Sequence, residues 1–520
     1  MYLMKMKYIA HSLCIAALTL SLGSCTNGFE EANRPAGSLS KDVLLTDNYL
    51  VASFLTQLQG FSFPEQENRY QCNFDLIGNY LGRYFTYAND GWSSKNFTTF
   101  SAPDDWLKWS TSQILVPTKS AIAEIESLTK PESLGYSWAL IMRAHAFLAL
   151  TDKYGPMPFG LDKKNPNGYN SQETIYKALV ADLDAAVKTI DGFLQENPKG
   201  LEYEEADKIY GGDFKKWRKF AHSLKLRIAI RMRYAAPELA KKYATEAVKA
   251  GVIESSADNC AITYIPRGLY KTSVEWGDSR ACADIDSYMN GYEDPRISAY
   301  FAEPKTAGDR KLIGCLAGAD VKNKKKAGDL YSAAAVTKST PSVWLSAAEM
   351  WFCRAEGALA GWPEMGLGNS VKELYERGVK ESFSQWNVSG ADEYLKSEKT
   401  PNDYKDAEGG FGKGMSATST ITPKWDDEAT EDTKLERLIV QKWIALFPNG
   451  QEGWSEIRRT GYPKVFALPA SRNGYTINVA NRIPYNPTER VLNKANYNAA
   501  LGILGGADDY ATKLWWQKKN

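Results

Sequence analysis

The sequence predicts a mostly α-helical protein, built as a scaffold of paired helices that carries large irregular insertions. Apolar residues recur at helical spacing in several long segments of the 520-residue chain. The stretches between these segments lose that spacing and are rich in aromatic residues, Gly, Asn and Asp. With 43% hydrophobic residues, the chain is long enough to bury a large core.

The first element is a secretory signal. Lys5 and Lys7 form a basic start, and the mostly apolar run over residues 8–22 is too short to span a bilayer comfortably. Leu22-Gly23-Ser24-Cys25 looks like a bacterial lipobox, in which the signal is cut before the cysteine and the cysteine thiol receives lipid. An ordinary signal peptide with an incidental Cys25 is the alternative.

We therefore expect residues 1–24 to be removed and Cys25 to anchor the protein to a membrane. Residues 25–45 are polar, contain Gly and Pro, and read as a flexible tether between the lipid and the body. The body of the protein is expected to span residues 46–520.

Charge and histidine content exclude several classes of function. Removal of Lys5 and Lys7 with the signal leaves 61 basic against 62 acidic residues, so nothing suggests a nucleic-acid partner. Once His11 is lost, only His145 and His222 remain, and both fall in predicted helices. A metal site built on several histidines is excluded, and we expect His145 to be a core residue.

The remaining cysteines show no CxxC spacing. They are odd in number, which argues against both a disulfide framework and a zinc site. A bridge between Cys282 and Cys315 stays open, and otherwise we expect free thiols, at Cys72, Cys260, Cys282, Cys315 and Cys353.

The helical scaffold is expected over about 46–60, 112–250, 343–386 and 431–458. Helix pairs of this length resemble tetratricopeptide units, although no strict repeat consensus is present. The individual predicted helices are 47–60, 114–128, 136–152, 172–193, 214–234, 237–250, 343–360, 369–386 and 431–447.

The aperiodic stretches are interpreted as insertions on this single scaffold rather than as separate domains. They cover about 61–110, 251–340, 387–430 and 461–520. Loops held by a rigid scaffold are the usual place for binding residues, so we expect the ligand side of the molecule here.

Motifs for catalysis are missing. The chain has no GxSxG, HExxH or Walker A sequence, and no cofactor or metal site is predicted. Asp284-x-Asp286 hints at a calcium loop but lacks its spacing and its terminal Glu. A pair of carboxylates for glycoside hydrolysis cannot be judged among 62 acidic residues.

Several motifs, in order behind the lipobox, resemble the SusD/RagB family of surface nutrient-binding lipoproteins of Bacteroidetes-type bacteria. The longest are the helix 436–447 and the segment Glu452 to Pro463. Within them, we expect Arg458 and Arg459 to form ion pairs with Glu452 and Glu456 that serve the scaffold. The other matching segments are 150–159, 294–296, 300–301, 347–356, 375–379, 482–489 and 515–516.

This resemblance implies a single SusD-like domain over residues 46–520, with a tetratricopeptide-like platform that captures an oligosaccharide at the cell surface. It also implies delivery to a TonB-dependent (SusC-like) barrel transporter, with the lipid anchor in the outer membrane. Glu30-Glu31 is a partial fit to an export signal for the outer leaflet. A peptide-binding member of the family and, from another class, a surface glycoside hydrolase are the alternatives; we expect a binding protein and not an enzyme.

Aromatic residues set among polar, aperiodic ones mark the predicted ligand face, because flat rings bind sugar C–H faces while polar side chains bind hydroxyls. The family tends to build its site from comparable regions. The alternative is that half of these side chains only pack the insertions onto the scaffold. The predicted ligand-binding residues are Arg83, Tyr84, Tyr87, Asn89, Asp90 and Trp92, with Tyr270, Trp276 and Tyr288 from a second region.

Overall fold

A computed structural model describes residues 48–263, 268–306, 308–469 and 474–518. The predicted signal peptide, the predicted lipid-attachment residue Cys25 and the predicted tether lie outside these residues. Residues from Ala52 to Asn520 form one compact unit. No helix among the described residues is long and apolar enough to cross a membrane.

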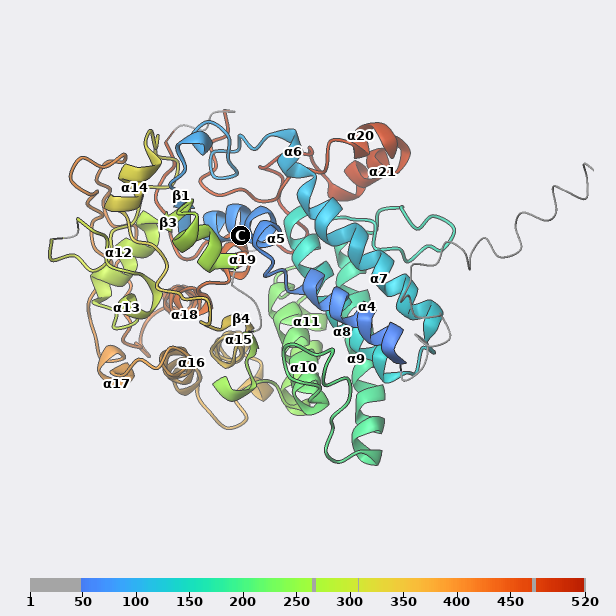
Figure 1. Ribbon diagram of the computed structural model, residues 1–520. Helices are drawn as coiled ribbons and strands as arrows, with labels where there is room; N and C mark the ends of the chain where they lie inside the picture. Colours follow the sequence, from blue (N-terminus) through green and yellow to red (C-terminus); the bar gives the residue numbers. More distant parts are fainter. Residues whose placement is uncertain (1–47, 264–267, 307, 470–473, 519–520) are drawn as a thin grey trace, which may run out of the picture. The chain divides into compact units, whose positions relative to one another are not determined.

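The predicted helical scaffold is confirmed. Helices α8, α9, α10 and α11 pack against one another in sequence order, and α15 packs against both α16 and α18 (Figure 1). Ser370 and Glu373 form a capping box that fixes the start of α16. The scaffold helices are α7 (Val116–Leu128), α8 (Leu134–Tyr154), α9 (Gln172–Glu196), α10 (Phe214–Arg231), α11 (Pro237–Ala250), α15 (Ala347–Leu359), α16 (Val371–Gln385), α18 (Glu431–Leu446) and α19 (Gly450–Thr460).

Strands are short and form two antiparallel pairs. β1 (Phe85–Tyr87) pairs with β3 (Ser279–Ala281), with Tyr87 opposite Ser279. β2 (Cys260–Ile262) pairs with β4 (Ser342–Leu345). The predicted helix 343–360 therefore begins only at Ala347, because its first three residues belong to β4 and Ser346 caps the helix.

The insertions contain more helix than the sequence indicated. Residues 71–79 form a π-helix, η2 (Gln71–Asn79), whose wider turn hides the usual helical spacing of apolar residues. The other helices are α4 (Tyr49–Ser62), α5 (Glu67–Tyr70), α6 (Asp104–Leu107), α12 (Ala283–Tyr292), α13 (Ile297–Tyr300), α14 (Lys324–Leu330), α17 (Ala391–Tyr394), α20 (Glu489–Leu492) and α21 (Lys494–Leu504).

Buried ion pairs connect the scaffold helices. Arg231 on α10 is 1% exposed and contacts both Asp152 of α8 and Glu452 of α19. One turn earlier, the Arg227 guanidinium lies 2.6 Å from the carboxylate of Glu349 on α15. Each charge has lost its water, so its opposite partner must stay in place for the fold to be stable.

A second group of buried charges joins α19 to α15 and α18. Arg459 contacts Glu356 at 2.5 Å and Glu456 at 2.5 Å, and Lys442 lies 2.9 Å from Glu456. The expected scaffold role of Arg459 is confirmed. The scaffold role of Arg458 is confirmed as well, but its expected ion pair is wrong, because its guanidinium donates to the backbone carbonyls of Asp152 and Asn481 and lies over the Trp454 ring at 3.4 Å.

Helix α19 also meets η2 backbone to backbone. A Cβ added to Gly450 would lie 2.4 Å from Cα of Asn79, and one added to Gly78 would lie 2.7 Å from the amide nitrogen of Gln451. Only glycine permits this approach. The crossing places η2, and the β1 strand that comes after it in the chain, at a fixed distance from the charged core.

We expect Arg231→Met to lower the free energy of unfolding by about 3–5 kcal/mol, because it removes the cation that contacts both buried carboxylates and leaves Glu452 with the more distant Arg227, at 3.6 Å. Arg218→Met on the same helix is the control; its pair with Asp191 is 39% and 45% exposed, so we expect a loss below about 1 kcal/mol. Urea denaturation of both variants provides the measurement. Equal losses would show that the buried contact has no special role.

We expect Gly450→Ala to lower the free energy of unfolding by about 2 kcal/mol or more, because its methyl group overlaps the backbone of Asn79. Gly192→Ala inside α9 is the control, since a Cβ there meets nothing within 4 Å. That control should gain about 0.5–1 kcal/mol. Thermal and urea denaturation report both, and an unchanged Gly450→Ala would contradict the close crossing.

Candidate functional site

The strand pair β1–β3 brings together two regions that lie almost 200 residues apart in the sequence. Immediately beyond the pair, the amide of Ala88 donates to the carbonyl of Asp278 at 2.7 Å. The residues that come after β1 therefore lie beside those that precede β3. These are the two regions in which the sequence places the ligand face.

A polar cluster forms around Asp278 at this junction. Its carboxylate accepts hydrogen bonds from the side chains of Asn89 at 2.9 Å, Gln71 at 3.0 Å and Lys324 at 2.5 Å. Asp278 is 7% exposed, whereas the Lys324 side chain is 38% exposed. Asp278 thus holds a lysine and two amides from three separate segments at the surface.

Asn89 and Asp90 sit in a tight turn beside this cluster. The Asn89 side chain accepts from the amide of Gly91 at 3.0 Å, which starts the turn that carries Trp92. Asp90 is exposed, and its carboxylate accepts from the amide of Lys324 at 3.4 Å. Asp90 also lines a shallow hollow of about 530 Å³, shared with residues 320–322.

Three half-buried indoles continue from this turn. The rings of Trp92 and Trp106 meet edge to face with centroids 5.9 Å apart, and Trp106 stacks on Trp109 at 5.0 Å. We call this set the indole row. Each of the three residues is partly exposed, so the row can offer apolar ring surface next to the polar cluster.

Four of the predicted ligand residues are corrected, because their side chains are buried. Their exposed fractions are 1% or less, so these side chains cannot reach a ligand at the surface. Their polar groups instead bind backbone carbonyls, which satisfies the three tyrosine hydroxyls and one nitrogen of the Arg83 guanidinium. The hydrogen bonds run from Arg83 to Asn478, from Tyr84 to Trp443, from Tyr87 to Ala319 and from Tyr288 to Lys464.

Tyr270 and Trp276 are half-buried and stay predicted ligand residues. They lie at the two ends of a short π-helical turn, η6 (Tyr270–Glu275), and Trp276 precedes the cluster residue Asp278 by two positions. Among the described residues, no ring contact joins either of them to Trp92. Trp276 therefore adjoins the polar cluster along the chain, and Tyr270 is connected to it through η6.

Sequence reasoning missed Asp278, Lys324, Trp106 and Trp109. The two tryptophans were visible as aromatics in an insertion, but nothing in their neighbourhood distinguishes an open ring from a buried one. Asp278 had no signal at all, because its role depends on partners contributed by three distant segments.

The described thiols, imidazoles and calcium-loop carboxylates serve the structure. Cys72, Cys260, Cys282, Cys315 and Cys353 are free, and Cys282 donates to Asp284 at 3.1 Å instead of bonding Cys315. Burial raises the pKa of the Cys72 and Cys353 thiols to about 12. His145 is confirmed as a core residue that stacks on Phe63, and burial lowers its pKa to about 3. The Asp286 carboxylate is occupied by the Arg310 guanidinium and by the amide of Gly314.

Comparison with known proteins agrees with this fold. The family model SusD-like, described as "Susd and RagB outer membrane lipoprotein", matches residues 31–517. No curated protein sequence matches the chain.

Solved structures match over nearly the whole chain. A SusD homologue from Bacteroides thetaiotaomicron is 34% identical with a TM-score of 0.85, covering 90% of this chain and 99% of its own. One from Bacteroides uniformis is 33% identical with a TM-score of 0.84, covering 91% and 100%. A chitin-binding SusD homologue from Flavobacterium johnsoniae is 32% identical with a TM-score of 0.84, covering 90% and 98%. The resemblance found in the sequence motifs is confirmed: the chain belongs to the SusD-like family of outer membrane lipoproteins.

Proposed function

We propose that the protein captures an oligosaccharide at the cell surface, on the face formed by the indole row and the Asp278 cluster. The observation that carries this proposal is the row of half-buried indoles beside the exposed carboxylate of Asp90, the half-buried amide of Asn89 and the half-buried ammonium of Lys324. A relative of 32% identity is a chitin-binding protein, which supports a glycan as the class of ligand.

The chemistry of this face suits a sugar chain. A pyranose ring has an apolar C–H face, which packs on an indole such as Trp92, and a rim of hydroxyls, which need polar partners. Asp90 supplies an acceptor two positions before Trp92, and the Lys324 ammonium, which donates to Asp278, supplies a donor in the same cluster. Because Asp278 already fixes Lys324, little side-chain entropy is lost when a ligand binds.

Capture without cleavage is part of the proposal. Two carboxylates for glycoside hydrolysis must flank the bond with a defined separation. In the Asp278 cluster the central carboxylate accepts three side-chain hydrogen bonds, which leaves it as a scaffold for its neighbours and not as an acid or a base. A peptide ligand for the same face is the second candidate within the family.

Delivery completes the proposed role. Lipid on Cys25 would hold the protein at the outer membrane, and the predicted tether, residues 25–45, would let the body extend away from the membrane surface. The captured oligosaccharide would then pass to a TonB-dependent barrel transporter. Co-purification of such a transporter with the tagged, lipidated chain from its native membrane tests this step, and a chain that purifies alone would count against it.

We expect Trp92→Ala and Trp276→Ala each to weaken oligosaccharide binding roughly tenfold or more, because each removes a face on which a sugar ring packs. Isothermal titration of residues 26–520 against chitin oligomers and other neutral oligosaccharides measures this, with product analysis on each mixture. The matched control is Trp351→Ala, which removes a half-buried indole on α15 that belongs to neither the indole row nor the Asp278 cluster.

Each outcome of this experiment is informative. Wild-type affinity in both tryptophan variants would show that the ligand face is misplaced. Oligosaccharides shortened during the titration would show that the protein hydrolyses its ligand. Titration with peptides in place of oligosaccharides tests the second candidate: peptide binding that the tryptophan variants lose, with no oligosaccharide bound, would favour it.

A further inference from the structure

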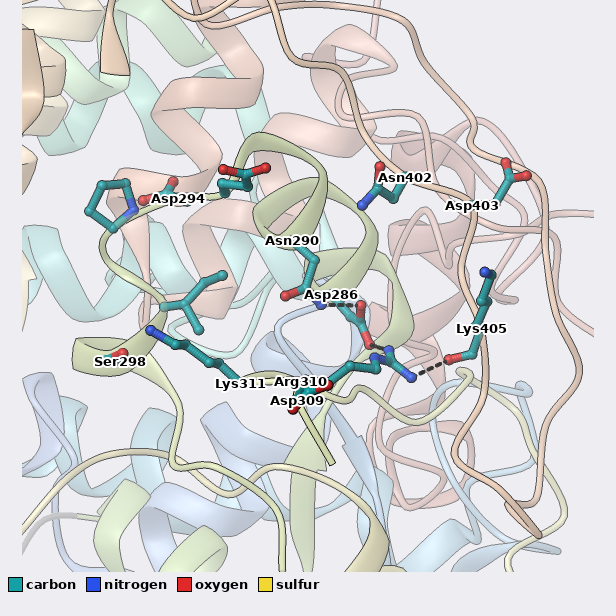
Figure 2. A pocket seen from close by; sticks show the side chains of 13 residues that line it. Asp286, Asn290, Asp294, Ser298, Asp309, Arg310, Lys311, Asn402, Asp403 and Lys405 are labelled. Atoms are coloured by element: carbon teal, nitrogen blue, oxygen red, sulfur yellow. Dashed lines mark hydrogen bonds and ion pairs between the residues drawn. The ribbon is translucent and has the colours of Figure 1, made fainter. Parts of the chain in front are cut away.

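A second surface feature, a polar cleft of about 830 Å³, lies along α12 and is separate from the indole row. Figure 2 shows the side chains that surround it. Its volume falls in the range of pockets that hold small ligands. The lining residues are Asp286, Asn290, Glu293, Asp294, Pro295, Ile297, Ser298, Asp309, Arg310, Lys311, Asn402, Asp403 and Lys405.

The walls of the cleft are fixed to one another. Arg310 donates to the carboxylate of Asp286 on α12 at 2.9 Å and to the carbonyl of Lys405 at 2.8 Å, as the dashed lines of Figure 2 mark. The amide of Asn402 donates to the carbonyl of Ser287 at 3.0 Å. Three chain segments are thereby held in place before any ligand arrives, which lowers the entropic cost of binding.

The loop 400–402 also packs backbone to backbone on α12. A Cβ added to Gly291 would lie 2.4 Å from the amide nitrogen of Asn402. The far wall of the cleft therefore cannot move toward α12, and the space between the walls is kept open by the fold.

Most charges at the cleft are already paired. Asp286 is neutralised by Arg310 at 2.9 Å, the buried Asp294 by Arg296 at 2.6 Å, and Glu293 contacts Lys399. These carboxylates give the cleft no net attraction for a cation, because each has its own positive partner.

Four charges that line the cleft make no ion pair within the described part of the chain. They are two ammonium groups, on Lys311 and Lys405, and two carboxylates, on Asp309 and Asp403. Asp403 accepts one hydrogen bond from the amide of Ala417 and keeps its second oxygen. All four residues are exposed. The complement to this set is a ligand that carries positive and negative groups at separate positions.

No aromatic ring lines the cleft, so a sugar would find no flat face to pack on. We propose that this cleft is a second binding site, which takes short zwitterionic peptides through ion pairs with Lys311, Lys405, Asp309 and Asp403. A peptide has a charged group at each end, and its amides can use Asn402 and Ser298. The site is independent of the oligosaccharide face.

Two tetrapeptides test the proposal by isothermal titration with residues 26–520, which include the whole compact unit. Lys-Gly-Gly-Glu with free termini should bind at least tenfold more tightly than acetyl-Gln-Gly-Gly-Gln-amide. Raising the salt concentration to about 0.5 M should weaken the first peptide several-fold, because exposed charges are screened over a few ångströms.

Variants of the four charged residues test whether the peptide binds in this cleft. The double variants Lys311→Met/Lys405→Met and Asp309→Asn/Asp403→Asn should each reduce its affinity at least fivefold. Lys241→Met, which removes an exposed lysine on α11, is the matched control and should change nothing. Trp276→Ala should also leave peptide binding intact, so failure of the oligosaccharide proposal and failure of this one are separable.

Three results would overturn the inference. The first is equal affinity for the two tetrapeptides, including no binding of either. The second is a zwitterionic peptide whose binding survives both double variants. The third is a neutral oligosaccharide whose binding is lost in the lysine double variant, since that would assign the cleft to glycans.

Discussion

The contact of Arg231 with Asp152 and Glu452 holds three helices of the scaffold in one arrangement. Hydrophobic burial is not directional, so apolar faces alone would let α8, α10 and α19 slide past one another. A guanidinium that serves two carboxylates fixes both distance and angle. Since all three groups are almost fully buried, any displacement would leave a charge without a partner.

Helix α19 connects this buried contact to the polar cluster at the surface. Its N-terminal glycine meets η2, and η2 leads through a single turn into β1. The strand then pairs with β3, and the polar cluster lies just beyond the pair. The position of Asn89 is therefore set by packing in the core, several elements away, which would keep the proposed binding face rigid.

Prediction from sequence was strongest where one side chain's role depends on its near neighbours. Helices such as α9 and α11 follow from apolar spacing and caps within a few residues. The predicted start of α15 was wrong. Val343, Trp344 and Leu345 are apolar residues that fit a strand as well as a helix, and only the pairing with β2 decides between the two.

The residues of the proposed binding face were harder to predict from the sequence, because their burial depends on contacts across the whole chain. Tyr84 and Trp92 look alike in the sequence, each an aromatic among polar residues. Tyr84 lies under α18 with its hydroxyl on the carbonyl of Trp443, whereas Trp92 projects from a turn. Asp278 could not be found, since its partners come from residues 71, 89 and 324.

The five described cysteines have a consequence for the durability of the protein. Oxidation and alkylation proceed through the thiolate, and burial disfavours that form by raising the pKa of the Cys72 and Cys353 thiols to about 12. Four of the five thiols are also shielded from solvent. In the folded protein, burial therefore protects these five described thiols, and none of them forms a disulfide with another.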